Sequence, residues 1–128
     1  MKLKLTDIPI VYINLDEQSD RNESIKTTLN DLGFKNITRV SAYKDVIGKR
    51  GCAYSHAIAL EEVEPPFILL EDDCLPLNFI DEIDIPDDAD AVYLGISSWG
   101  RMNAHSGPCV QCDEVEGHDD LARVYNMV

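Results

Sequence analysis

The sequence predicts an α/β protein, with a mostly parallel β-sheet flanked by helices. Short apolar runs rich in β-branched and aromatic residues alternate with segments of helical period, which is the pattern of a βαβ chain. The first run, residues 8–15, is almost continuously apolar, as in a strand that is buried on both faces. At 128 residues the chain has the length of one domain, so we treat 1–128 as a single domain.

The first strand and helix are predicted near the N-terminus. Residues 8–15 (IPIVYINL) form the first apolar run. Ser19 or Asp20 is a suitable N-cap for the helix, and Glu23 would complete a capping box with Asp20. Gly33 stands where the helix should end. Apolar residues at helical spacing define its packed face: Ile25, Leu29 and Leu32.

A second strand and a second helix follow. Residues 36–42 (NITRVSA) read as the strand, and residues 48–63 read as a helix that opens after a glycine-containing turn. Pro65 and Pro66 end this helix, because proline cannot continue it. We expect His56 at the edge of the packed face. That face should consist of Ala53, Ala57 and Leu60.

The remaining strands are short. Residues 67–70 (FILL) form a buried strand that runs directly into three carboxylates, and residues 90–96 (DAVYLGI) form a fourth strand. Segments 110–115 and 122–128 could be short strands as well. The last of these stays apolar to the final residue without a loop signal, so we expect a chain truncated at its C-terminus.

Composition excludes several classes of protein. A formal net charge of −13 disfavours nucleic acid as a partner, because binding it requires Lys and Arg to neutralise phosphates. No apolar run reaches the roughly 20 residues that span a bilayer. The apolar N-terminal stretch is interrupted by Thr6, Asp7 and Pro9 and lacks a cleavage site, so we expect no signal peptide and a cytoplasmic protein.

The strongest chemical signal is the triplet Glu71-Asp72-Asp73. Three consecutive carboxylates at the end of a buried strand are costly unless a positive group compensates them. Strand alternation would place Glu71 and Asp73 on one face and Asp72 on the other. Two carboxylates on one face can share Mg²⁺ or Mn²⁺. The alternative is an acidic turn in water.

Two further groups of polar residues are expected near the same edge of the sheet. Asn14 and Asp16 end the first strand and could bind a base or ribose, and Arg21 in the next helix could meet a phosphate. Alternatively, Asp16 only begins a turn and Arg21 pairs with Asp20 or Glu17. Ser55 and His56 follow a glycine-rich, basic helix start that suits anions. The alternative is an ordinary helix serine and a core histidine.

The cysteines permit a metal site of a different kind. His105, Cys109, Cys112 and His118 lie within 14 positions, and CxxC is a genuine zinc spacing, but the interleaved order differs from that of zinc fingers. We therefore expect a surface loop with reduced thiols, and a structural zinc site is the alternative. Cys52 and Cys74 lie in apolar contexts and are expected to be small core residues.

In combination these motifs resemble glycosyltransferase family 25, which includes lipooligosaccharide and procollagen galactosyltransferases. The matching segments follow the family's order and cover nearly the whole chain from Ile8 onward, except for residues 97–120. They are Ile13-Asn14-Leu15-Asp16, Asp20-Arg21, Gly51-Cys52-Ala53-Tyr54-Ser55-His56, Leu70-Glu71-Asp72-Asp73, Tyr93-Leu94-Gly95 and Ala122-Arg123-Val124-Tyr125-Asn126.

The resemblance implies a GT-A-like fold and transfer of a hexose with inversion, galactose from UDP-galactose being the expected donor. It implies that Asp73 and Glu71 hold Mn²⁺ or Mg²⁺. The nucleotide sugar would be bound by Asn14, Asp16, Arg21, Ser55, His56 and Asp72.

The same resemblance leaves part of the enzyme unassigned. Members of the family run to roughly twice this length, so the general base and the contacts to a glycan or other hydroxyl acceptor are expected outside this chain. The alternative function is a non-catalytic module with the same fold that binds a sugar nucleotide or a partner.

Overall fold

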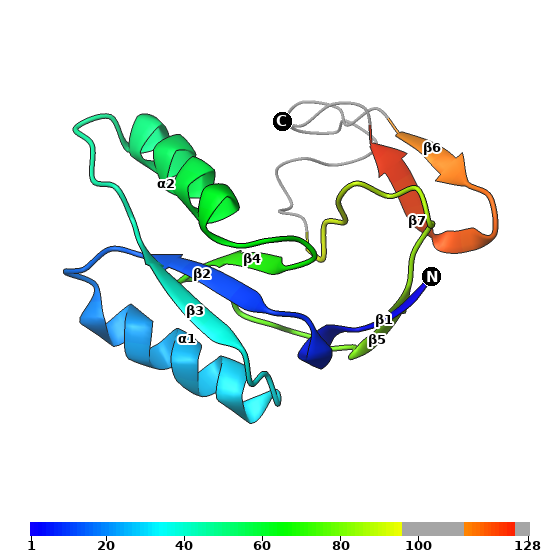
Figure 1. Ribbon diagram of the computed structural model, residues 1–128, viewed down its shortest axis with the longest axis horizontal. Coiled ribbons are helices and arrows are strands. Elements are labelled where there is room, and N and C mark those ends of the chain that lie inside the picture. The colour runs from blue at the N-terminus through cyan, green and yellow to red at the C-terminus, as the bar shows by residue number, and fades with distance from the viewer. Residues whose placement is uncertain (96–111, 125–128) are drawn as a thin grey trace. The chain divides into compact units, whose positions relative to one another are not determined.

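The computed structural model describes residues 1–95 and 112–124, which fall into two compact units. One unit is Lys4–Glu82. The other consists of Met1–Leu3 and the described residues from Ile83 onward. The predicted strands and helices of the first 71 residues all belong to the unit Lys4–Glu82, and this unit contains the candidate site (Figure 1).

A three-stranded parallel sheet forms the centre of this unit. Its order is β3-β2-β4, with β2 (Ile10–Asn14) between β3 (Ile37–Ser41) and β4 (Ile68–Glu71). All five residues of β2 are buried. The prediction of a mixed α/β protein with parallel strands is therefore confirmed for this unit.

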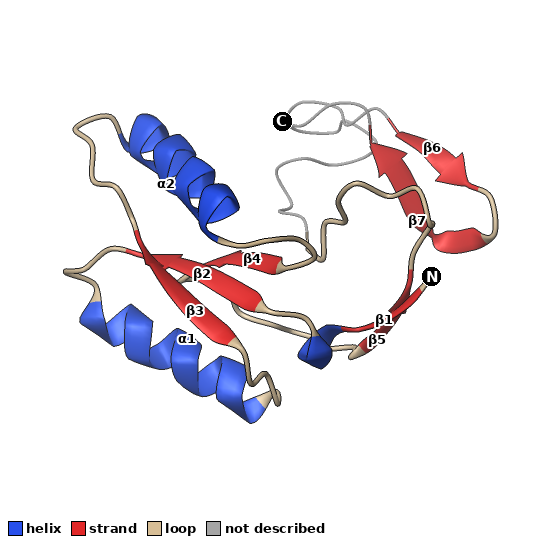
Figure 2. Ribbon diagram, viewed as in Figure 1, coloured by secondary structure: helices blue, strands red, loops and turns tan. Residues whose placement is uncertain are grey.

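Two helices connect the strands from opposite sides of the sheet (Figures 1 and 2). Helix α1 (Ser19–Asp31) links β2 to β3, and helix α2 (Gly48–Glu62) links β3 to β4. The first connection moves to one side of β2 and the second returns to its other side. Because such crossovers are right-handed, they place the two helices on opposite faces.

The two faces of β2 divide the core between these helices. Val11 and Ile13 pack with Val40 and with Ala59 of α2. Tyr12 faces the other way, and its hydroxyl donates a hydrogen bond to Asn22 Oδ1 of α1. Since side chains alternate along a strand, Asn14 lies on the α1 side with Tyr12.

Helix α1 confirms the predicted face but not the predicted cap. Ile25 and Leu29 are buried, and Gly33 adopts a φ of 95° just beyond the helix, as a C-terminal glycine should. The helix already begins at Ser19, and its N-cap is Gln18, which makes no side-chain cap hydrogen bond. The capping box of Asp20 and Glu23 was therefore wrong, because Asp20 already lies in the first helical turn.

Helix α2 packs through a different face from the one predicted. Its buried residues, Gly51, Ser55 and Ala59, recur every four positions and are small. A Cβ atom at Gly51 would lie 2.8 Å from the carbonyl oxygen of Tyr43, so the helix approaches the preceding loop too closely for larger side chains. The small size of these three residues, rather than their hydrophobicity, therefore determines which face of α2 is buried. The predicted face is exposed: Ala53, Ala57 and Leu60.

The remaining strands are short and lie in the second unit or at its boundary. Strand β1 (Lys2–Lys4) pairs with β5 (Glu82–Asp84), and β6 (Cys112–Val115) forms an antiparallel pair with β7 (His118–Val124). The last two overlap the segments predicted at 110–115 and 122–128. The predicted strand at 90–96 is wrong over its described part, since residues 90–95 form no strand.

No helix in the described ranges combines the length and apolar character needed to cross a bilayer.

In the unit Lys4–Glu82, a 3-10 turn at Leu5–Asp7 precedes β2 and buries Leu5. The Thr6 side chain and backbone N–H both donate to the carboxylate of Asp81. This contact ties the start of the unit to the segment that leaves the sheet after β4.

Candidate functional site

The candidate site lies at the carboxyl edge of the parallel sheet. Asn14, Ser41 and Glu71 are the last residues of β2, β3 and β4. The connection after β2 leads to β3 on one side of β2, and the connection after β3 crosses to β4 on its other side, so the strand order reverses at the boundary between β2 and β4, the topological switch point. Open α/β sheets bind ligands at this position.

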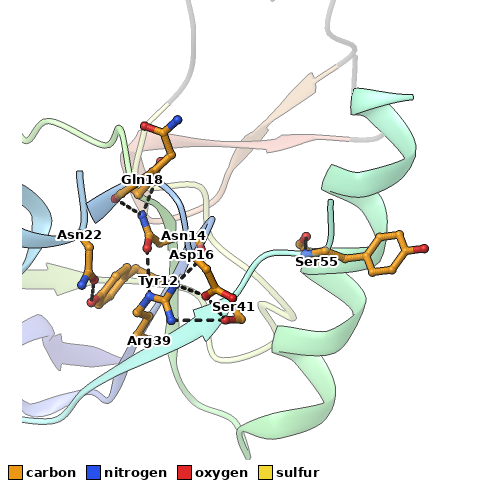
Figure 3. A network of polar contacts seen from close by, with 10 residues as sticks. Tyr12, Asn14, Asp16, Gln18, Asn22, Arg39, Ser41 and Ser55 are labelled. Carbon is orange, nitrogen blue, oxygen red and sulfur yellow. Dashed lines mark hydrogen bonds and ion pairs between the residues drawn. The ribbon is translucent and has the colours of Figure 1, made fainter. Parts of the chain in front are cut away.

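Asn14 is the centre of a polar network at the switch point (Figure 3). Its side-chain Nδ2 donates to Asp72 Oδ2 at 2.7 Å and to the Gln18 carbonyl at 3.0 Å. Its Oδ1 accepts a hydrogen bond from Arg39 Nε at 2.9 Å. With only 2% of its surface exposed, Asn14 is a connector between charged groups and offers little surface to a ligand.

Arg39 is the site residue that the sequence analysis missed. Its Nη2 donates to Asp16 Oδ1 at 2.6 Å, and Ser41 Oγ donates to the same oxygen. These two bonds, that of Ser41 first, lower the pKa of Asp16 below its ordinary value. The parallel register pairs Asn14 with Ser41, so Arg39 and Ser41 share a face with Asn14. Two polar residues at alternate positions of the strand at 36–42 were the available signal.

The carboxylate triplet does not continue the strand. Strand β4 ends at Glu71, and Cys74 N donates to the Glu71 carbonyl, which makes Asp72 and Asp73 the central residues of a turn. The predicted alternation, which placed Glu71 and Asp73 on one face, therefore does not hold. Asp72 turns towards Asn14. Asp73 is exposed and forms no hydrogen bond or ion pair with any other described residue.

Arg21 pairs with this turn rather than with its neighbours on α1. Its Nη1 lies 3.5 Å from Asp72 Oδ1, whereas Asp20 and Glu17 had been the alternative partners. The Arg21 side chain is 55% exposed and that of Asp72 only 11%. Arg21 can therefore contact a second anion from solvent while it neutralises Asp72.

Ser55 has a structural role in α2. Its hydroxyl donates to the Gly51 carbonyl at 2.7 Å and accepts a bond from the Tyr43 N–H at 2.8 Å. Ser55 is 2% exposed and stands apart from the network around Asn14 in Figure 3. The predicted contact of Ser55 with a nucleotide sugar has no surface through which to occur, so its effect on a ligand would be indirect.

His56 lies beside Glu71 and Cys52. Its Nε2 is 3.6 Å from Glu71 Oε1, and Cys52 Sγ is 3.7 Å from the same oxygen. The prediction that Cys52 is a core residue is wrong, since it is exposed, while Cys74 is partly buried. The pKa of the Cys52 thiol is raised, first by partial desolvation and then by the negative charge of Glu71.

The residues of the alternative zinc site lie mostly outside the described part of the chain. His105 and Cys109 lie beyond the described residues, as does the side chain of Cys112, and only His118 is described, in β7. Residues 97–120 match no family motif, and those from 97 to 111 also lie outside the described part of the chain. The expected loop with reduced thiols therefore stays a prediction, and the zinc site stays its alternative.

Compared with known proteins, the sequence matches no family model, no curated protein and no solved structure. The resemblance to glycosyltransferase family 25 therefore rests on the motifs themselves and stays a prediction. What supports a function is the chemistry at the carboxyl edge of the sheet.

Proposed function

We propose that this chain is the nucleotide-sugar-binding part of a glycosyltransferase that transfers a hexose, galactose from UDP-galactose being the expected donor. The observation that supports it is the bond between Asn14 and Asp72 across the switch point, with Arg21 beside it. This edge is where parallel α/β sheets bind nucleotides. The family resemblance supplies the substrate class.

In this proposal the exposed groups around Asn14 bind the donor. Asp16 is held by Arg39 and Ser41, and both bonds go to its Oδ1. Its Oδ2 is therefore positioned to accept a bond from a ribose hydroxyl or a base. Arg21, which is more than half exposed, would meet a phosphate with its free guanidinium edge.

In this proposal Asp73 is the ligand of Mn²⁺ or Mg²⁺. Mg²⁺-type ions bind one or two carboxylates together with substrate phosphates, and Asp73 is the exposed carboxylate of the turn. The ion, when bound, would stabilise the negative charge that develops on a nucleoside diphosphate leaving group. Glu71, the second predicted ligand, lies among nitrogen and sulfur donors instead.

A second candidate is a non-catalytic module that binds a sugar nucleotide. The favouring observation is that Asp72 already accepts a hydrogen bond from Asn14 and is paired with Arg21, which leaves Asp73 as the free carboxylate of that turn. Both candidates place the nucleotide at the same edge of the sheet. Hydrolysis or transfer of the sugar separates them, because only the transferase should break the glycosidic bond.

Calorimetric titration of the chain with UDP-galactose, with and without Mn²⁺, tests nucleotide binding. We expect saturable binding that Mn²⁺ strengthens. Arg21→Ala should weaken it by about tenfold or more, because a hydrogen bond to a charged group contributes about 1.5–3 kcal/mol.

Lys26→Ala is the matched control. It removes an exposed cation from the same helix, where Lys26 pairs only with Glu23 among the described residues. We expect it to leave the affinity unchanged. A folded chain that binds neither UDP nor UDP-galactose would contradict the proposal, as would equal losses in the two variants.

A further inference from the structure

Three side chains of different chemistry meet between helix α2 and the end of strand β4. Among the described residues, Cys52, His56 and Glu71 are the one group of three potential metal ligands, and their ligand atoms all lie within 4.8 Å of one another. Two of them come from α2 and the third is the last residue of β4. The group differs from the predicted pair of Glu71 and Asp73.

Glu71 Oε1 is spaced from the other two ligands as ligands are around one metal ion. Bond lengths of about 2.3 Å to sulfur and about 2.0–2.2 Å to nitrogen or oxygen place tetrahedral ligands about 3.3–3.6 Å apart. Glu71 Oε1 lies 3.6 Å from His56 Nε2 and 3.7 Å from Cys52 Sγ. Cys52 Sγ lies 3.6 Å from His56 Nδ1, so the exposed side chains of Cys52 and Glu71 have to rotate to bring the sulfur, Nε2 and the carboxylate onto one ion.

The histidine ring is already oriented for coordination. His56 Nδ1 lies 2.9 Å from the backbone carbonyl of Cys52, to which an Nδ1–H donates. This bond leaves the lone pair on Nε2, the nitrogen that faces Glu71. Metal-binding histidines are typically fixed in this way by a hydrogen bond from the second ring nitrogen.

The backbone around the three residues is fixed by independent contacts. Cys52 and His56 are four positions apart on α2 and therefore project from the same face of the helix. The helix is held by the Ser55 bond to Tyr43 N and by the close approach at Gly51. Strand β4 is held by its register with β2, in which Glu71 pairs with Ile13.

We propose that Cys52, His56 and Glu71 bind a borderline-soft divalent ion of the Zn²⁺ class. A thiolate and an imidazole favour zinc and related transition metals, whereas Mg²⁺ and Mn²⁺ favour oxygen ligands. Three protein ligands leave one tetrahedral position open for water or another small ligand. This inference does not depend on the proposed function, because the ion binds without a nucleotide.

Titration of the full chain with Co²⁺ tests the site. Cobalt replaces zinc in such sites, and a cobalt–thiolate bond gives a charge-transfer absorption band. We expect such a band, and we expect Zn²⁺ to displace the cobalt while excess Mg²⁺ leaves it in place.

Four variants assign the ligands. Cys52→Ser should abolish the charge-transfer band of this site. His56→Ala and Glu71→Gln should each weaken cobalt binding at least about tenfold, the lower limit for loss of even an outer-shell partner. Cys74→Ser is the matched control, since it removes another described thiol outside the group and should change neither the band nor the affinity.

The comparison is made between variants, so metal held by other cysteines does not affect it. The proposal is overturned if Cys52→Ser, His56→Ala and Glu71→Gln all bind cobalt like Cys74→Ser. Because Cys52 and Glu71 are exposed, their variants are expected to fold, and circular dichroism checks this. Loss of UDP binding in Arg21→Ala with cobalt binding intact would separate the two sites.

Discussion

At the scale of single residues, the polar groups of this unit are divided between structure and binding. Asn14 and Ser55 are buried, and their side chains bond to groups of the chain itself. Asp16 and Arg21 are largely exposed, although each has a partner. A buried polar side chain costs free energy when it loses its partner, so the first two residues should matter mainly for stability.

Ser55→Ala tests this division. The substitution leaves the Tyr43 N–H without its acceptor at a position that is 2% exposed, so we expect the free energy of unfolding to fall by about 1–3 kcal/mol. Ser24→Ala, at an exposed position of α1, should change it by less than about 0.5 kcal/mol. Urea denaturation measures both, and equal effects would contradict the structural role.

Some residues of the site could be predicted from the sequence, and others could not. Asn14, Asp16, Arg21 and Asp72 could be named because they follow or flank an apolar run. Arg39 could not, because its role depends on the register that sets β3 beside β2. The alternation expected for Glu71 and Asp73 does not hold, since strand β4 ends at Glu71 and Asp72 and Asp73 lie in a turn.

At the scale of elements, strong apolar runs predicted the fold and weak ones did not. Two strands of the parallel sheet, β2 and β4, are nearly continuous apolar runs, whereas β3 also carries Thr38, Arg39 and Ser41; all three strands were found. Strands β1 and β5 have three residues each and carry charges, so no periodicity reveals them. The packed face of α2 was misjudged because the close contact selects small residues.

The loop before α2 should make stability sensitive to acid. Asp45 accepts bonds from Arg50 and from the Ile47 N–H, and these bonds, that of Arg50 first, lower its pKa below the ordinary 3.8. A carboxylate whose pKa is lowered in the folded state stabilises that state at pH values above the pKa that the same group has in the unfolded chain. This contribution is lost as the pH falls from about that value through the folded pKa.

Asp45→Asn should therefore reduce stability near neutral pH and flatten the loss of stability below the ordinary Asp pKa. Thermal unfolding measured across this pH range checks both expectations. Glu64→Gln, which removes one negative charge from an exposed position beyond α2, is the matched control. A wild-type and an Asp45→Asn protein with parallel pH profiles would show that the Asp45 bonds contribute nothing.

At the scale of the whole molecule, charge repulsion should oppose folding. The chain has 11 Lys and Arg residues against 24 Asp and Glu residues, which gives a formal net charge of −13. Repulsion among these charges destabilises compact states, and salt screens it over a Debye length that falls from about 30 Å at 0.01 M to about 10 Å at 0.1 M.

We therefore expect the melting temperature to rise by a few degrees when NaCl increases over this range. The described ion pairs are mostly exposed, and pairs of that kind contribute little to stability. Thermal unfolding without divalent ions measures the effect. A melting temperature that falls as salt is added would mean that attractive pairs dominate the electrostatics.

The close contact at Gly51 links the packing of helix α2 to the loop that follows strand β3. A side chain at position 51 would push against the Tyr43 carbonyl and the Asp45 backbone nitrogen. The same loop carries the Tyr43 N–H that binds Ser55 and begins just after Ser41, which bonds to Asp16. We therefore expect Gly51→Ala to displace the loop that follows Ser41 and, through the bond between Ser41 and Asp16, to change the position of the solvent-facing Asp16 carboxylate.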